Sequence, residues 1–195
     1  GADEWKHLAY IYDRKAKGGD GGVPPLEETG SSGGSGSGGG SGSSAATVTA
    51  VAAGEYNSLF LKSDGSLWVM GYDQSGELGN GAGGDNVDTP QQIVASGVTE
   101  IAQNSSDVGS TSLFIKSNGS LWGIGWNGYG QLGDGSTAYA VSPTYVSIPV
   151  GRTALGLAMG SRHACAILDN QSLECWGRND EGQLGDGTIV GSYSP

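Results

Sequence analysis

Three copies of one sequence pattern occupy the chain from about Thr47 onward, and they constrain its fold more than any other feature. The segments 64–81, 118–135 and 170–187 align without a gap, and equivalent residues recur at steps of 54 and then 52 residues. A repeat of this length indicates one supersecondary unit that buries its apolar face against its neighbours. The leucines that keep these steps form the expected repeat core: Leu67, Leu78, Leu121, Leu132, Leu173 and Leu184.

Each copy has the pattern of consecutive antiparallel strands. The strand-like segment 58–63 leads into Asp64-Gly65, a dipeptide that tolerates the positive φ of a two-residue hairpin turn. The segments 89–94 and 142–148 are predicted to be outer strands, where proline is tolerated because an edge strand can leave an N–H unpaired. The expected fold class is therefore all-β: three four-stranded propeller-type blades, forming a partial or open β-propeller with an extended N-terminal arm.

The sequence divides into five segments. They are an N-terminal arm (1–30), a Gly/Ser linker (31–46), repeat 1 (47–97), repeat 2 (98–149) and repeat 3 (150–195), whose outer strand is truncated. Three blades are too few to close a ring, so a stack of this size leaves apolar faces and strand edges that must be covered from elsewhere.

The arm contains an apolar cluster that the neighbouring polar residues cannot bury. The segment 7–13 could add to a sheet edge as a β-strand, form a short helix or stay without regular structure, and strand addition is the favoured interpretation. Docking on the same chain and docking on a neighbouring molecule both remain open. The predicted assembly residues of the arm are Trp5, Leu8, Tyr10, Ile11 and Tyr12.

Charge and hydropathy exclude two classes of partner. The formal net charge is −11, and residues 46–195 hold 14 acidic against 5 basic side chains. An acidic surface without a basic stripe repels phosphate backbones, so a nucleic acid partner is not expected. No run approaches the roughly 18 apolar residues that a membrane helix needs, so no membrane span is expected. The N-terminus also has no basic-then-apolar leader.

The only two cysteines, Cys165 and Cys175, lie symmetrically about the predicted turn at Asn170. In an antiparallel hairpin this symmetry places them opposite one another, at a separation that a disulfide can bridge. Two buried free thiols, or a metal site with His163, are the alternatives. A disulfide implies an oxidising compartment, and we therefore expect a secreted or cell-surface protein. No catalytic residue, cofactor site or metal site is predicted.

The strand that ends in Gly, followed by S-L-F-L-K-S-D-G-S-L-W and then G-x-L-G-x-G, resembles the regulator-of-chromosome-condensation propeller family, most of all its bacterial members. The resemblance covers roughly residues 47–195. It implies a propeller that binds proteins, because members are typically seven-bladed protein-binding rings. The nucleotide-exchange activity of the founding member does not carry over, since its contact residues cannot be matched and this chain has three units.

Two functions follow as hypotheses. The first is a non-enzymatic, extracellular structural or assembly protein, bacterial in origin, in which blades and arm hold copies together as a homo-oligomer or filament. The alternative is a protein-binding module, part of a larger propeller, that recognises its partner through the loops 82–88 and 136–141.

Overall fold

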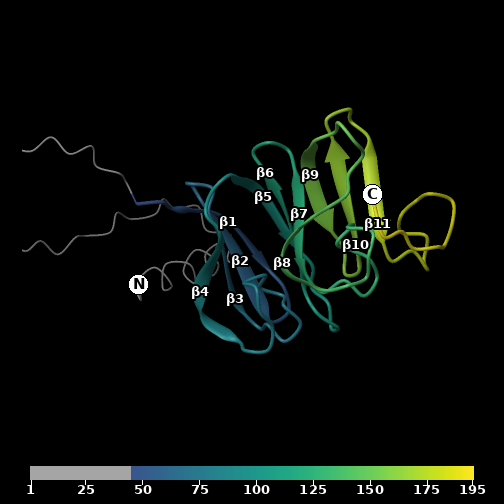
Figure 1. Ribbon diagram of the computed structural model, residues 1–195. Coiled ribbons are helices and arrows are strands. Elements are labelled where there is room, and N and C mark those ends of the chain that lie inside the picture. Colours follow the sequence, from purple (N-terminus) through teal and green to yellow (C-terminus); the bar gives the residue numbers. More distant parts are fainter. Residues whose placement is uncertain (1–44) are drawn as a thin grey trace, which may run out of the picture. The chain divides into compact units, whose positions relative to one another are not determined.

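The structure is a computed structural model and describes residues 45–195. The chain divides into two units, Gly1–Ala45 and Ala46–Pro195, and the eleven strands of the described part all belong to the second. These strands form three sheets that follow one another along the chain (Figure 1). The structure thus has the all-β class and the open stack of blades that the sequence predicts.

The strand bounds are as follows. The first sheet contains β1 (Val48–Ala53), β2 (Asn57–Lys62), β3 (Leu67–Gly71) and β4 (Val87–Val94). The second contains β5 (Val98–Gln103), β6 (Thr111–Lys116), β7 (Leu121–Gly125) and β8 (Ala140–Tyr145). The third contains β9 (Ala154–Met159), β10 (His163–Leu168) and β11 (Leu173–Gly177).

Each sheet is an antiparallel meander in which consecutive strands pair. The first two have four strands, in the orders β1-β2-β3-β4 and β5-β6-β7-β8, whereas the third has three, in the order β11-β10-β9. The predicted outer segments 89–94 and 142–148 coincide largely with β4 and β8. In the third sheet only one bridge, Gly177 with Ser192, represents this outer strand.

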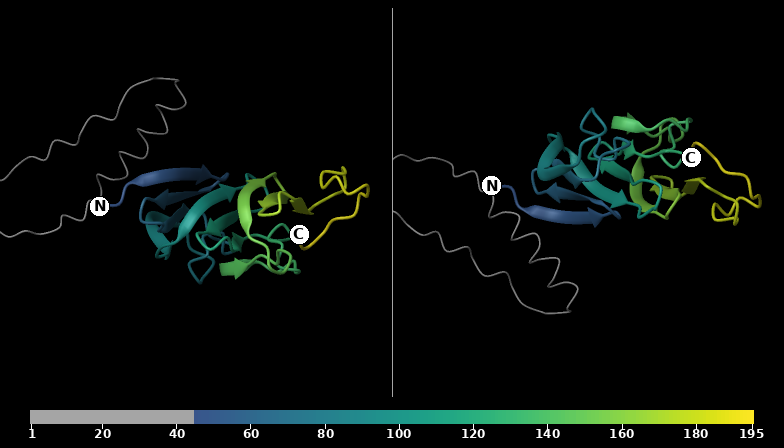
Figure 2. Two further views of the ribbon diagram at one scale, coloured as in Figure 1. Left: turned by 90° about the horizontal axis from the view of Figure 1, so that it is seen from above. Right: turned by 90° about the horizontal axis from the view of Figure 1, so that it is seen from below.

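Two apolar clusters join the sheets face to face. One lies between the first and second sheets and contains Leu67 and Phe114. The other lies between the second and third sheets and contains Leu121 and Trp176. The middle sheet is therefore covered on both faces, and the views in Figure 2 show the three sheets in succession. The core of this unit is a pair of inter-sheet seams.

Most of the predicted core leucines lie in these seams. Leu67, Leu78, Leu121 and Leu132 are at most 1% exposed. The expectation for Leu173 is wrong, because this residue is 66% exposed, and Leu184 is only half-buried. In the first two sheets the equivalent positions face the next sheet. No sheet among residues 45–195 follows the third, so Leu173 and Leu184 remain in contact with solvent.

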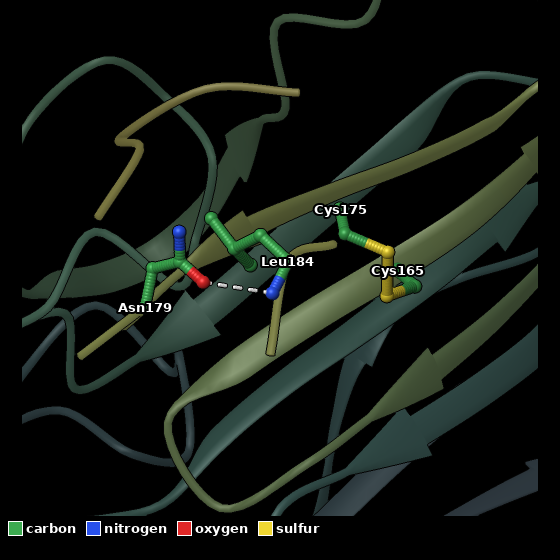
Figure 3. The surroundings of a disulfide bond; sticks show 4 residues. All are labelled: Cys165, Cys175, Asn179 and Leu184. Carbon is green, nitrogen blue, oxygen red and sulfur yellow. Dashed lines mark hydrogen bonds between the residues drawn. A yellow bond between two sulfur atoms is a disulfide. The ribbon is translucent and has the colours of Figure 1, made fainter. Parts of the chain in front are cut away.

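The two cysteines lie where the hairpin symmetry places them. Cys165 pairs with Cys175 across β10 and β11, with Cα atoms 4.1 Å apart, and a disulfide joins them (Figure 3). The equivalent cross-strand pairs are Leu59 with Val69 and Leu113 with Gly123. A covalent bond thus replaces an apolar contact at one repeat position.

The arm residues lie outside the described residues. This applies to Trp5, Leu8, Tyr10, Ile11 and Tyr12, and to the linker as far as residue 44. Their role in assembly stays a prediction.

Candidate functional site

The three longest connections within a sheet, 72–86, 104–110 and 126–139, all emerge at one end of the stack. Because successive strands are antiparallel, the connections 54–56, 72–86, 104–110, 126–139 and 160–162 emerge at the same end, followed by 178–195. We call this the loop end. The tight hairpin turns, such as 63–66 and 117–120, lie at the opposite end. Loops on a rigid scaffold are common sites of binding, so the loop end is the first place to look for function.

The loop end is supported by a hydrogen-bond pattern that recurs in every repeat. In the first bond, a buried Asp or Asn side-chain oxygen accepts from the backbone N–H of the leucine in the G-x-L-G-x-G turn. In the second bond, the side-chain oxygen of the Glu or Gln just before that leucine accepts from the backbone N–H of the residue two positions before the Glu or Gln. The first bond joins Leu78 N–H to Asp73 Oδ1 (3.0 Å), Leu132 N–H to Asn127 Oδ1 (2.8 Å) and Leu184 N–H to Asn179 Oδ1 (2.9 Å; Figure 3). The second joins Ser75 to Glu77 (2.7 Å), Tyr129 to Gln131 (3.0 Å) and Glu181 to Gln183 (2.9 Å). These loops are therefore held in one geometry.

Asp73 is the one member of this pattern with a charge at the first position. Its carboxyl group is 1% exposed, and burial raises the pKa of Asp73 above its ordinary value, although hydrogen bonds from Leu78 and Asn80 oppose the rise. A raised pKa in the folded state means that ionisation costs stability. That cost is absent below the unfolded-state pKa and grows as the pH rises through the folded-state pKa.

We therefore expect Asp73→Asn, which copies Asn127 and Asn179, to stabilise the protein at pH 7. A gain of about 1 kcal/mol corresponds to a rise in Tm of roughly 2–4 °C for a unit of this size. Differential scanning calorimetry at pH 7 and at pH 3.5 measures it, and the difference between variant and parent should vanish at the lower pH. A gain of equal size at both pH values would contradict this account.

An aromatic–arginine cluster lies at the loop end where the second and third sheets meet. The Arg162 guanidinium lies 5.1 Å from the centre of the Tyr129 ring, and that of Arg178 lies 5.6 Å from it. Arg162 also donates to the Tyr129 hydroxyl (3.1 Å). Trp126 packs edge-on against Tyr129, with ring centres 5.6 Å apart, and its indole N–H donates to Tyr139 (3.1 Å). Two cations and three rings thus meet at one place.

Both arginines are paired with a surface carboxylate. Arg162 donates to Asp107 (2.9 Å), and Arg178 donates to Asp180. The hydrogen bond from Arg162 holds the pKa of Asp107 below its usual value, and the one from Arg178 does the same for the pKa of Asp180. The Nε atoms of both arginines are buried and have no hydrogen-bond partner among residues 45–195. The ion pairs orient the guanidinium groups and leave part of their donor capacity unused.

The sign of the charge differs between the cluster and its surroundings. Arg162 and Arg178 are two of the five basic residues in 46–195, and the other three, Lys62, Lys116 and Arg152, lie at the opposite end of the strands. Besides the buried Asp73 and Glu77, eight of the fourteen acidic residues lie at or beside the loop end: Glu55, Asp85, Asp88, Asp107, Asp134, Asp180, Glu181 and Asp186. The cluster is therefore the basic, aromatic centre of an acidic surface.

The cluster was not found from the sequence. Its members occupy repeat positions where the other copies have different residue types: Tyr129 corresponds to Ser75 and Glu181, and Arg162 corresponds to Tyr56 and Ser110. Departure from the repeat pattern was the available signal. The predicted contact loops do lie at the loop end, since residues 82–86 and 137–139 are exposed there.

Residues 45–195 contain neither a group of side chains that could hold a metal ion nor a helix that could cross a membrane. Within 45–195, no three His, Cys, Asp or Glu side chains gather closely enough to hold a metal ion. The same residues form no helix with the length and apolar character needed to cross a membrane.

Three meandering sheets, packed face to face with long loops at one end, define a segment of a β-propeller. Two family models, both described as the regulator of chromosome condensation (RCC1) repeat, match this chain, one at residues 118–167 and the other at 48–77 and 156–183. The chain is a member of the RCC1-type β-propeller repeat family.

Curated relatives align with the blades over most of this chain. The ultraviolet-B receptor UVR8 of Arabidopsis thaliana is 31% identical over 148 residues, which cover 76% of this chain and 33% of the receptor. The E3 ubiquitin-protein ligase HERC2 of Homo sapiens is 32% identical over 147 residues, which cover 75% of this chain and 3% of the ligase. The chain thus spans a third or less of the length of these relatives.

Solved structures show the same fold. Human WBSCR16 superimposes with a TM-score of 0.65 at 21% identity, over 77% of this chain and 39% of that protein. Prp20p from Saccharomyces cerevisiae, described together with its binding to Gsp1p and histones, superimposes with a TM-score of 0.64 at 21% identity, over 76% of this chain and 37% of Prp20p.

Proposed function

We propose that this chain is a protein-binding module that holds its partner at the loop end, with the aromatic–arginine cluster at the centre of the contact. The proposal rests on the aromatic–arginine cluster. Tyr, Trp and Arg are the residue types that dominate binding energy in protein interfaces, because they combine a large contact area with directional polar groups. Here Trp126, Tyr129, Arg162 and Arg178 are pre-organised by mutual contacts, so less side-chain entropy is lost on binding.

The relatives support a protein rather than a small molecule as the ligand. Prp20p, which has the same fold, binds the proteins Gsp1p and histones, and this is an analogy of fold. The relatives as a group favour the protein-binding module over the assembly protein, because none of them supports an extracellular structural role. We assign no reaction to the chain, since it covers 3% of the HERC2 ligase.

Site-specific photo-cross-linking can identify the partner. A benzophenone amino acid at Tyr129 is expected to capture a protein from an extract of the source cells. The same amino acid at Asn118, exposed in a hairpin turn at the opposite end, should not capture it. Equal capture at both positions would reject the loop end as the binding surface.

Arg162→Ala is expected to weaken binding of the identified partner at least tenfold, and about 30-fold if it removes the roughly 2 kcal/mol of an interface hot spot. Titration calorimetry with the purified partner measures the change in Kd. The matched control is Arg152→Ala, which removes an exposed arginine paired with Asp169 (3.9 Å) at the opposite end. Equal losses in the two variants would refute a special role for the cluster.

We also propose that the protein works in an oxidising compartment, as a secreted or cell-surface protein. The Cys165–Cys175 disulfide supports this, because such bonds persist outside reducing compartments. Alkylation of the protein from its natural source, before and after reduction, provides the test. Two cysteines that react without reduction would contradict the proposal.

A further inference from the structure

Three Asn-Gly steps occur in the chain, and the structure distinguishes them. They are Asn80-Gly81, Asn118-Gly119 and Asn127-Gly128. In such a step the glycine nitrogen can attack the side-chain carbonyl carbon of the asparagine, because glycine has no Cβ atom to crowd the approach. The asparagine of the third step is 0% exposed, whereas those of the first two are exposed to solvent. The first two steps are therefore the ones open to this chemistry.

Two hydrogen-bond donors meet the side-chain oxygen of Asn118. The backbone N–H of Ser120 donates to Asn118 Oδ1 (3.0 Å), and so does the Ser120 hydroxyl (2.7 Å). The indole N–H of Trp122 donates to the same hydroxyl oxygen (2.8 Å), and this leaves the hydroxyl proton for Asn118. When a nitrogen attacks Cγ, negative charge develops on Oδ1, and donors aimed at that oxygen stabilise it. The turn thus activates the Asn118 carbonyl.

Two other exposed asparagines each lack one part of this arrangement. Asn80 Oδ1 accepts one hydrogen bond within residues 45–195, from a backbone N–H (3.1 Å). Asn170 is the equivalent of Asn118 in the third repeat. Its Oδ1 accepts from the N–H (3.1 Å) and the hydroxyl (2.8 Å) of Ser172, but Gln171 follows it, and the Gln171 side chain crowds the attacking nitrogen. In residues 45–195, Asn118 is the exposed asparagine that combines two donors with a following glycine.

One backbone hydrogen bond opposes the attack in both hairpin turns. The Gly119 N–H donates to the Lys116 carbonyl (2.7 Å), and the Gln171 N–H donates to the Leu168 carbonyl (2.8 Å). The nitrogen becomes free when the turn opens, and opening costs little at an exposed hairpin tip. Because this bond is common to the two turns, it does not produce a difference in rate between them.

We propose that Asn118 is a site of spontaneous deamidation in the folded protein. The Gly119 nitrogen gives its proton to solvent and attacks Asn118 Cγ, and the side-chain nitrogen takes up a proton and leaves as ammonia. Water then adds to one carbonyl of the cyclic succinimide. Cleavage at Cγ gives aspartate, and cleavage at the backbone carbonyl gives isoaspartate, in which the main chain has an extra carbon. This proposal does not depend on the loop-end function.

The first repeat shows that the aspartate product fits this turn. Asp64 holds the equivalent position, and its Oδ1 accepts from the Ser66 N–H (2.9 Å). Hydrogen bonds from Ser66 hold the pKa of Asp64 below its usual value, and the positive charge of Lys62 acts in the same direction. Lys116 holds the place of Lys62 in the second repeat. We therefore expect the aspartate product to be ionised and to keep the turn.

The isoaspartate product does not fit in the same way. The Gly119 carbonyl accepts from the Ala154 N–H (2.8 Å) at the start of β9, and a Cβ atom on Gly119 would overlap the Thr153 side chain. An extra main-chain carbon moves this glycine where the packing has no slack. Isoaspartate should therefore loosen the second sheet from the third and lower Tm. The Asn118→Asp variant should keep Tm within about 2 °C, as surface changes usually do.

Peptide mass spectrometry of the full chain, after prolonged incubation at neutral pH, tests the proposal. Trypsin releases residues 117–152 as one peptide, which holds both Asn118 and the buried Asn127, so fragment ions compare the two directly. We expect aspartate and isoaspartate to accumulate at Asn118, with little product at Asn127 or Asn170. If Asn118 stayed intact while Asn80 reacted, or reacted no faster than Asn170, the proposal would be overturned.

Two variants separate the effect of the donors from that of the Asn-Gly step. Ser120→Ala removes the hydroxyl donor and should slow deamidation at Asn118 about fivefold, the effect of losing one ordinary hydrogen bond in the transition state. Gln171→Gly gives Asn170 a following glycine, which suits the φ of 70° at that position, and Asn170 should then react at a rate comparable with that of Asn118. An unchanged or raised rate in Ser120→Ala, or an inert Asn170 in Gln171→Gly, would contradict the assigned chemistry.

Discussion

Trp176→Ala is expected to destabilise the three-sheet unit by about 3–5 kcal/mol, the range for deleting a fully buried tryptophan. Trp176 is 0% exposed and joins two sheets, because its indole N–H donates to the Gln131 carbonyl (2.9 Å). Its ring lies against Gly133, where a Cβ atom would be 2.6 Å from Nε1. The alanine variant loses this hydrogen bond and leaves a cavity in the seam. Urea denaturation followed by far-ultraviolet circular dichroism measures the change.

Two controls separate the seam from general effects of substitution. The Trp176→Phe variant keeps most of the buried area and loses the hydrogen bond. Its free energy of unfolding should therefore fall by at most about half as much as that of Trp176→Ala. Leu173→Ala removes an exposed leucine from the same strand and should change stability by no more than about 0.5 kcal/mol. If Leu173→Ala cost as much as Trp176→Ala, the assignment of the core to the seams would be wrong.

The Cys165→Ala/Cys175→Ala variant is expected to be about 2–3 kcal/mol less stable than the parent. The disulfide closes a short loop, with a sequence separation of 10, and this range is the chain-entropy estimate for a loop of that length. For a unit of this size the loss corresponds to a fall in Tm of about 5–10 °C. Differential scanning calorimetry of parent and variant provides the measurement.

Reduction supplies the control for this prediction. Dithiothreitol should lower the Tm of the parent by a similar amount and leave that of the double variant unchanged. A parent whose Tm does not respond to complete reduction, verified by alkylation, would show that β10 and β11 are held together without the covalent bond.

Much of the fold could be predicted because the same pattern of strands and turns occurs in all three repeats. Asp64-Gly65 marks a hairpin turn, the alternating apolar residues mark strands, and the hairpin symmetry about Asn170 places Cys165 opposite Cys175. These are local properties, since turn chemistry and cross-strand register depend on residues within one repeat.

The candidate site could not be predicted in the same way. Tyr129 and Arg162 are 33 residues apart and belong to different repeats, and only the packing of the second sheet against the third brings them together. The loops 82–88 and 136–141 were expected at a binding surface and lie at the loop end, but the sequence did not single out the cluster beside them. Contacts between repeats depend on the angle and offset of neighbouring sheets, which no single repeat encodes.

The sequence by itself determined the strands, their register, the hairpin turns and the pairing of the two cysteines, because each of these depends on residues close together in the chain. Only the tertiary structure decided which equivalent positions are buried. Leu67, Leu121 and Leu173 occupy one position in the repeat, yet the first two are 0% exposed and the third is 66% exposed. The physical reason is that a side chain on a sheet face is buried only when a second surface packs against that face. The third sheet meets no following sheet within residues 45–195.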